Sequence, residues 1–162
     1  MLRTIARSVR AAGTKCRALW ADSAGVSLLE FAAILPAFLA LLVGGAKFGI
    51  AMSQYIAVTN AAALAAQTFA LSRGANTPYA AVTTAIGNAA PNLASGSITK
   101  TLIVNGGSPC TDDSTCKSQL TTAGAGTTAS VQVSYPCDLT VLGVNFKPGG
   151  CTLSATSAQM VQ

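Results

Sequence analysis

The sequence contains no histidine, and this absence excludes much of enzyme and metal chemistry. Imidazole is the side chain that most often transfers protons near neutral pH, and it is a frequent metal ligand. Charged residues make up 9% of the 162 residues and aromatic residues 6%, which does not suit a large enzyme core. No lysine or histidine stands beside a conspicuous serine to activate it. We therefore expect no catalytic site, no metal and no cofactor.

The net charge of +5 is gathered near the start of the chain. Such a basic cluster is typical either of nucleic-acid binding or of the cytoplasmic flank of a membrane span. A long apolar segment follows directly, which favours the flank and predicts no nucleic-acid partner. Residues 1–23 could form a weakly amphipathic helix at the inner membrane surface. The cations concerned are Arg3, Arg7, Arg10, Lys15 and Arg17, opposed only by Asp22.

The apolar segment runs from Val26 to Ala46 and carries a single charge, Glu30. At the helical rise this length gives roughly 30 Å, which is enough to cross a bilayer. Lys47 marks the far end, where its side chain can reach the interface. Between Gly49 and Ser72 the sequence has no proline and no further glycine, so we expect one continuous helix from about Val26 to Ser72.

The residues after this helix predict a small α+β head. The extramembrane part of the helix should pack onto the head through Ile50, Val58, Ala62, Ala65 and Phe69, which fall near one face. A short helix is expected over 78–89, with Pro78 in its first turn. Four segments with β-branched alternation predict an antiparallel sheet, namely 97–104, 129–136, 139–146 and 151–161. Segments 105–116 and 121–128 are predicted as loops.

The cysteines are divided by the apolar segment. Cys16 lies alone on the basic side, and the other four lie beyond the segment: Cys110, Cys116, Cys137 and Cys151. An even set in a small loop-rich region indicates two disulfides in an oxidising compartment. A zinc site is the alternative, but no closely spaced cysteine pair supports it. Three pairings are open, and we favour Cys110 with Cys116 and Cys137 with Cys151, because each closes a local loop.

Two adjacent carboxylates, Asp112 and Asp113, lie between the first two of these cysteines. They could indicate calcium, whose protein sites use oxygen ligands. A calcium loop, however, spaces its ligands at alternate positions, which this segment does not do. A solvated loop closed by a disulfide is the interpretation that we favour.

The most specific pattern surrounds Gly25. A basic leader, Gly25, the run "VSLL", then Glu30, Phe31 and an apolar helix resemble the signal of the type IV pilin superfamily. In that family a prepilin peptidase cuts after the glycine, which here predicts cleavage between Gly25 and Val26. A secretory signal would place its cleavage site after the apolar region. A plain single-pass anchor is the other alternative.

The resemblance can be narrowed to a family. The stretch "GVSLLEFAAILPAFLALLVGGAKFGIAMSQYIAVTNAAALAAQTFA", with a head that ends in "VQVSY" and "LSATSAQMVQ", is similar to the TadE-like minor pseudopilins of the tight-adherence (Flp/Tad) pilus. Family members often carry an arginine near the end of the alanine-rich helix. Gln67 stands there in this chain and the nearest arginine is Arg73, so the role of that cation does not carry over.

The resemblance implies a structural protein. We expect a minor pseudopilin that helps to initiate, cap or assemble a Flp/Tad pilus for adhesion. Its implied partners are the prepilin peptidase, other minor pseudopilins, the major Flp pilin, the inner-membrane assembly platform and membrane lipid. Major Flp pilins are much shorter and lack such a head. The alternative is a single-pass membrane protein whose disulfide-stabilised head binds a ligand or surface.

Three residues of the apolar helix are expected to serve subunit docking, namely Glu30, Phe31 and Pro36. After cleavage, the new α-amino group of Val26 could neutralise Glu30 in the same chain or in a neighbour. Pro36 removes one backbone donor and should loosen the helix, which is either tolerated or used in packing. Gly45 and Gly49 are spaced for close helix contact.

The expected organisation has four parts. A basic leader at 1–25 precedes a transmembrane helix at 26–47, its extramembrane continuation at 48–73 and the head at 74–162. The protein should lie in the inner membrane with a cytoplasmic N-terminus and an extracytoplasmic head, and it could also enter the pilus.

Overall fold

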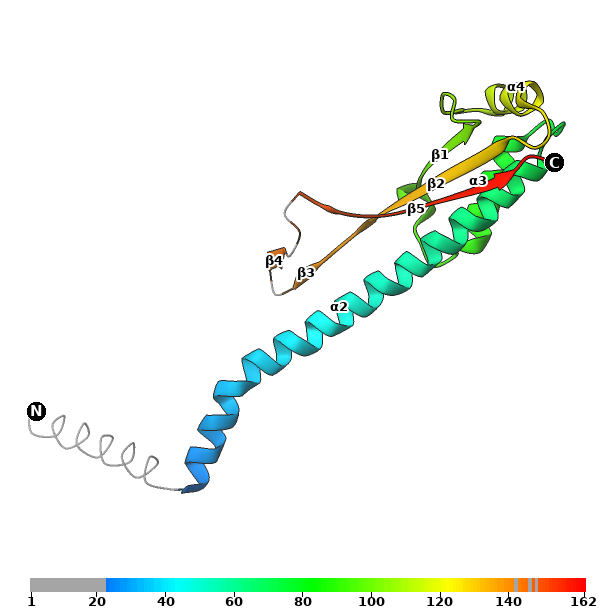
Figure 1. The fold of residues 1–162 in the computed structure, drawn as a ribbon. Helices are drawn as coiled ribbons and strands as arrows, with labels where there is room; N and C mark the ends of the chain where they lie inside the picture. Colours follow the sequence, from blue (N-terminus) through cyan, green and yellow to red (C-terminus); the bar gives the residue numbers. More distant parts are fainter. Residues whose placement is uncertain (1–22, 142, 146, 148) are drawn as a thin grey trace, which may run out of the picture. The chain divides into compact units, whose positions relative to one another are not determined.

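The computed structural model describes residues 23–141, 143–145, 147 and 149–162 (Figure 1). The predicted amphipathic helix of the leader lies outside these residues. The chain divides into two compact units, and the division falls between Gly45 and Ala46. One helix, α2 (Ser23–Leu71), contains residues of both units.

Helix α2 forms because its sequence is dominated by alanine, leucine and other residues that favour helical backbone. The helix continues through Pro36 and through the glycines that follow. At its end, the Ser72 amide bonds the Phe69 carbonyl oxygen at 3.1 Å, and Gly74 adopts the left-handed conformation with φ of 81°. The predicted continuous helix, expected to end at about Ser72, is confirmed.

The core of the second unit begins on α2, where small side chains form a buried face. Val58, Ala62, Ala65 and Phe69 are all buried, as predicted from their spacing. Ile50 is not part of this face, because 57% of its surface is exposed. The prediction for Ile50 is therefore wrong: it lies two turns before Val58, where the buried face begins.

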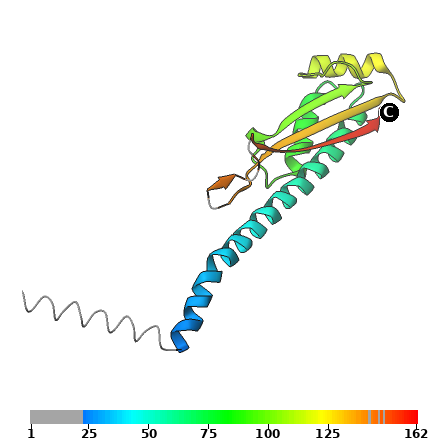
Figure 2. The ribbon, with the colours of Figure 1, turned by 60° about the vertical axis from the view of Figure 1, so that its left-hand side comes forward.

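A three-stranded antiparallel sheet packs onto this face (Figure 2). Its strands are β1 (Thr99–Val104), β2 (Thr128–Cys137) and β5 (Cys151–Met160), in the order β1-β2-β5. Alternate side chains of the central strand are buried, namely Ala129, Val131 and Val133. The predicted antiparallel sheet is confirmed, and its apolar side faces the core.

Helix α3 (Pro78–Ala89) has the predicted bounds and buries Val82 and Ile86. A 3-10 turn, η1 (Ser95–Ser97), leads from it into β1. Helix α4 (Asp113–Ala123) was not expected, because its residues fall in or between the two segments predicted as loops. Asp112 and Thr115 form a capping box that starts α4, and Cys116 and Leu120 bury its inner face.

A second departure concerns the predicted strand over 139–146. The chain instead forms a short hairpin of β3 (Thr140–Val141) and β4 (Val144–Asn145). Gly143 lies between the two strands with φ of 81°, a conformation that glycine adopts without strain. A turn at this glycine replaces one continuous strand with two short ones.

Both expected disulfides are present. Cys110 pairs with Cys116 and Cys137 with Cys151, at Cα separations of 5.1 and 4.9 Å. The second pair joins neighbouring positions at the ends of β2 and β5. Each bridge therefore closes a local loop, as predicted.

The buried face of α2 gives a test of the core. Phe69→Ala should lower the free energy of unfolding by about 3–5 kcal/mol, because it leaves a cavity where a fully buried ring packs. Phe48→Ala is the matched control, since 68% of Phe48 is exposed, and it should change stability little. Chemical denaturation in detergent micelles measures both, and equal effects would contradict this description of the core.

Candidate functional site: the apolar helix and its neighbours

The described part of the first unit, residues 23–45, is apolar helix, and most of its large side chains from Leu28 onward are exposed. These side chains include Leu28, Leu29, Ile34, Leu41 and Leu42, and the exposed fraction reaches 75% at Leu41. The helical stretch Ser27–Leu71 is long and apolar enough to cross a membrane. Contiguous apolar surface of this extent is unusual in water and indicates contact with lipid or with other apolar helices.

The predicted cleavage residues, Gly25 and Val26, both lie within α2. The backbone at this bond is therefore helical, whereas a protease needs it extended. Glycine costs about 1 kcal/mol relative to alanine in a helix interior, so it makes local unwinding easier. Cleavage between Gly25 and Val26 remains a prediction.

The predicted docking residues lie along the same helix. Glu30 is exposed, and so are Phe31 and Pro36. Glu30 follows Val26 by four residues, a spacing that puts two positions on one side of a helix. Glu30 and Val26 therefore lie on the same side of α2. The docking role of all three residues remains a prediction.

Three glycines of α2 have no neighbouring atoms close to the position that a side chain would take. A Cβ atom added at Gly44, Gly45 or Gly49 would meet no atom within 4 Å outside its local helix. Packing within the described chain therefore does not require glycine at these positions. Their small size instead permits another helix to approach closely.

Sequence reasoning did not foresee the contact made by Lys47. Its Nζ atom lies 2.9 Å from Oδ2 of Asp138, which follows β2. The Thr140 amide also donates to Asp138, at 2.9 Å. The hydrogen bond from Lys47 is the main reason why the pKa of Asp138 is lowered to about 2, and the hydrogen bonds from Thr140 add to it. No sequence pattern links two residues 91 positions apart.

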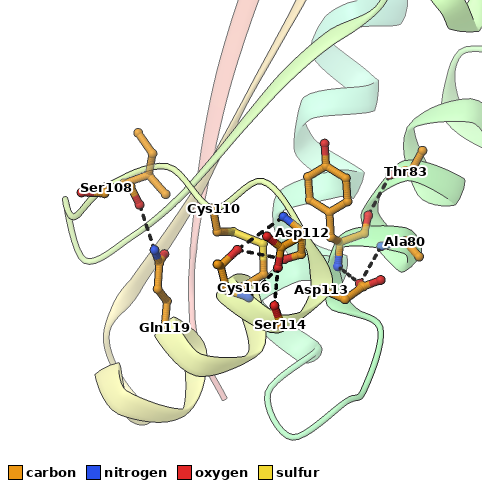
Figure 3. The surroundings of a disulfide bond; sticks show 12 residues. Ala80, Thr83, Ser108, Cys110, Asp112, Asp113, Ser114, Cys116 and Gln119 are labelled. Atoms are coloured by element: carbon orange, nitrogen blue, oxygen red, sulfur yellow. Dashed lines mark hydrogen bonds between the residues drawn. A yellow bond between two sulfur atoms is a disulfide. The ribbon is translucent and has the colours of Figure 1, made fainter.

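The Asp112–Asp113 pair has a structural explanation (Figure 3). Asp112 accepts the Thr115 amide at 2.8 Å and caps α4. Asp113 accepts the amides of Tyr79 and Ala80 at 2.8 and 3.0 Å and so caps α3. Hydrogen bonds, first of all from Ser114, lower the pKa of Asp112. In the described part of the chain, no three histidine, cysteine or acidic side chains cluster as metal ligands would.

Lys100 has a lowered pKa, which is a property that reactive lysines can also have. Its Nζ lies 4.4 Å from the centroid of the Tyr79 ring and donates to the Thr83 hydroxyl. Partial burial lowers the pKa of this amine. The ammonium is therefore held by neighbours on α3 and serves packing between α3 and β1.

The fold and the exposed helix define a class: they fit a single-pass membrane protein with a small disulfide-bonded head. Among the comparisons with known proteins, residues 25–67 match the family model described as TadE-like protein. The match begins at Gly25 and ends within α2, so the sheet and both disulfides lie outside it. No curated protein and no solved structure matches the chain. The match associates the protein with the Flp/Tad pilus, whose TadE-like proteins are typically structural.

The Lys47–Asp138 contact predicts a pH dependence. Because the folded pKa of Asp138 is about 2 and its ordinary value is 3.8, the contact stabilises the fold above about pH 4 and this contribution is lost as pH falls toward 2. The ¹³C shift of the Asp138 carboxyl group should titrate near 2 in the native chain. In Lys47→Met the midpoint should rise toward the ordinary value. An unchanged midpoint would show that Lys47 does not hold the carboxylate.

Proposed function

We propose that this protein is a minor pseudopilin of a Flp/Tad pilus and that a prepilin peptidase cuts it between Gly25 and Val26. The cut chain remains in the inner membrane through the first part of α2, with the head on the extracytoplasmic side. There it joins other minor pseudopilins and the major Flp pilin at the inner-membrane assembly platform. Its role is to initiate, cap or assist assembly of a pilus used for adhesion.

One observation carries this proposal: the match to the TadE-like family, residues 25–67, covers the exposed apolar part of α2 and continues into its buried face. A helix that only anchored a binding head would need an apolar surface but no acid near its start. Glu30 stands in this surface and is exposed. A carboxylate at such a position is costly in lipid unless a cation meets it.

Cleavage would create that cation. A new α-amino group at Val26 lies one helical turn before Glu30, and it is also free to meet the acid of an adjacent subunit. Pairing of the two charges in a low-dielectric environment offsets part of the desolvation of each. The pair would then fix the axial position of one helix against the next. The basic residues before Gly25 would keep the leader in the cytoplasm until it is removed.

Gly25→Leu should accumulate in cells as uncut precursor, because a bulky helix-favouring residue replaces the residue that lets the backbone open. Gly44→Leu is the matched control: it changes a glycine of the same helix, outside the cleavage site, and should be cut normally. Immunoblotting of membrane fractions separates precursor from mature chain. Normal processing of Gly25→Leu would refute the cleavage site.

Glu30→Ala should still be cut but should associate poorly with other pilus subunits. Loss of one partner of a desolvated pair costs about 3–5 kcal/mol, which corresponds to a loss of more than about a hundredfold in association. Ser27→Ala, an exposed change one turn away, should associate normally. Co-precipitation of subunits and a count of surface pili measure the effect. Normal pilus assembly by Glu30→Ala would show that Glu30 has no role in subunit docking.

A further inference from the structure

We infer that the loop closed by Cys137 and Cys151 contacts the phospholipid headgroup layer where α2 leaves the membrane. The described part of this loop is residues 138–141, 143–145, 147 and 149–150, here called the membrane loop. The inference rests on the membrane anchoring in the proposed function and goes beyond it, because it assigns a lipid-contacting surface to the head.

The first observation is the attachment of the loop to α2. Lys47 Nζ and Asp138 Oδ2 are 2.9 Å apart, and both residues belong to the second unit. The disulfide between Cys137 and Cys151 closes the loop at its base. The loop is therefore fixed at the end of β2 and at the start of β5, and Asp138 also bonds it to Lys47 of α2. It cannot move far from Lys47 without loss of this contact.

The second observation is the place of Lys47 along the chain. Val26–Ala46 already supplies roughly the 30 Å needed to cross the hydrocarbon core. Lys47 is the next residue, so it enters the headgroup layer, which is about 5–8 Å thick on each side. The Asp138 side chain that bonds Lys47 must lie at the same depth. This places the start of the membrane loop at the lipid interface.

The third observation is the character of the exposed side chains. Phe48 and Ile50 follow Lys47 on α2 and are 68% and 57% exposed. In the membrane loop, Val144 is 60% exposed near the exposed cation Lys147. Apolar side chains beside a lysine suit a phospholipid interface, where the former enter the acyl boundary and the latter meets phosphate.

A second protein helix could also cover Phe48 and Ile50. Lipid is favoured because this apolar surface continues directly from a segment of membrane-spanning length. A protein partner would shield the membrane loop from lipid, and the experiment below separates the two.

The test uses the full chain in phosphatidylcholine vesicles that contain lipids brominated near the carboxyl end of their acyl chains. Trp20 is the only tryptophan, so Trp20→Phe gives a silent background. Three single tryptophans are compared: Val144→Trp in the membrane loop, Leu42→Trp in the span and Ser118→Trp on the exposed side of α4. Bromine quenches tryptophan emission only at close contact.

We expect loss of emission for Val144→Trp and Leu42→Trp and none for Ser118→Trp. Quenching of Leu42→Trp without quenching of Val144→Trp would show that the membrane loop does not contact lipid, and it would leave the membrane anchoring intact. No quenching of Leu42→Trp would overturn the anchoring itself. Equal quenching of Ser118→Trp would show that the whole head lies on lipid, which also contradicts the inference.

A second variant tests the attachment to Lys47. Asp138→Lys, added to Val144→Trp, should restore emission, because two like charges replace the pair. Thr152→Lys adds the same charge at an exposed position of β5 and should leave the quenching unchanged. Both variants keep the two disulfides, which a mass measurement confirms. Unchanged quenching in Asp138→Lys would show that Lys47 does not position the membrane loop.

Discussion

A single helix in this protein meets two different environments, and the rest of the structure depends on how its side chains divide between them. Up to Ile56, α2 exposes large apolar residues to its surroundings. From Val58 to Ala70 it buries a face made mainly of alanine. Large side chains gain most from lipid, whereas small ones let the helix and the sheet approach closely. The head can pack onto the helix only because the sequence changes character along one unbroken element.

The head has few large side chains, so local devices support its core. The two disulfides close short loops, each of which contributes about 2–3 kcal/mol in the chain-entropy model. The acids are used in the same way: Asp112 starts α4, Asp113 caps α3 from another element and Asp138 holds Lys47. These contacts fix the starts of two helices and the loop after β2.

Much of this fold could be predicted because its signals are local. The long apolar run predicted α2, and Pro78 marked the start of α3. The alternation of β-branched residues predicted β1, β2 and β5. Helix α4 was missed because serine, threonine and aspartate favour loops, and because its capping box carries Thr115 where glutamate or glutamine is more common. The β3–β4 hairpin was missed because Gly143 was not recognised as a turn. The Lys47–Asp138 pair depends on tertiary structure, which no local pattern contains.

The predicted cleavage and docking residues differ from the fold in this respect, because their roles depend on other molecules. The family match supports the interpretation of the apolar helix, but cleavage at Gly25 and docking by Glu30 involve a peptidase and other subunits. Both depend on one event, the release of an amino group at Val26. The most direct measurement is therefore the mature N-terminus of the protein purified from its membrane, by mass spectrometry. The account predicts a chain that begins at Val26; a chain that begins at Met1, or well beyond Gly45, would contradict it.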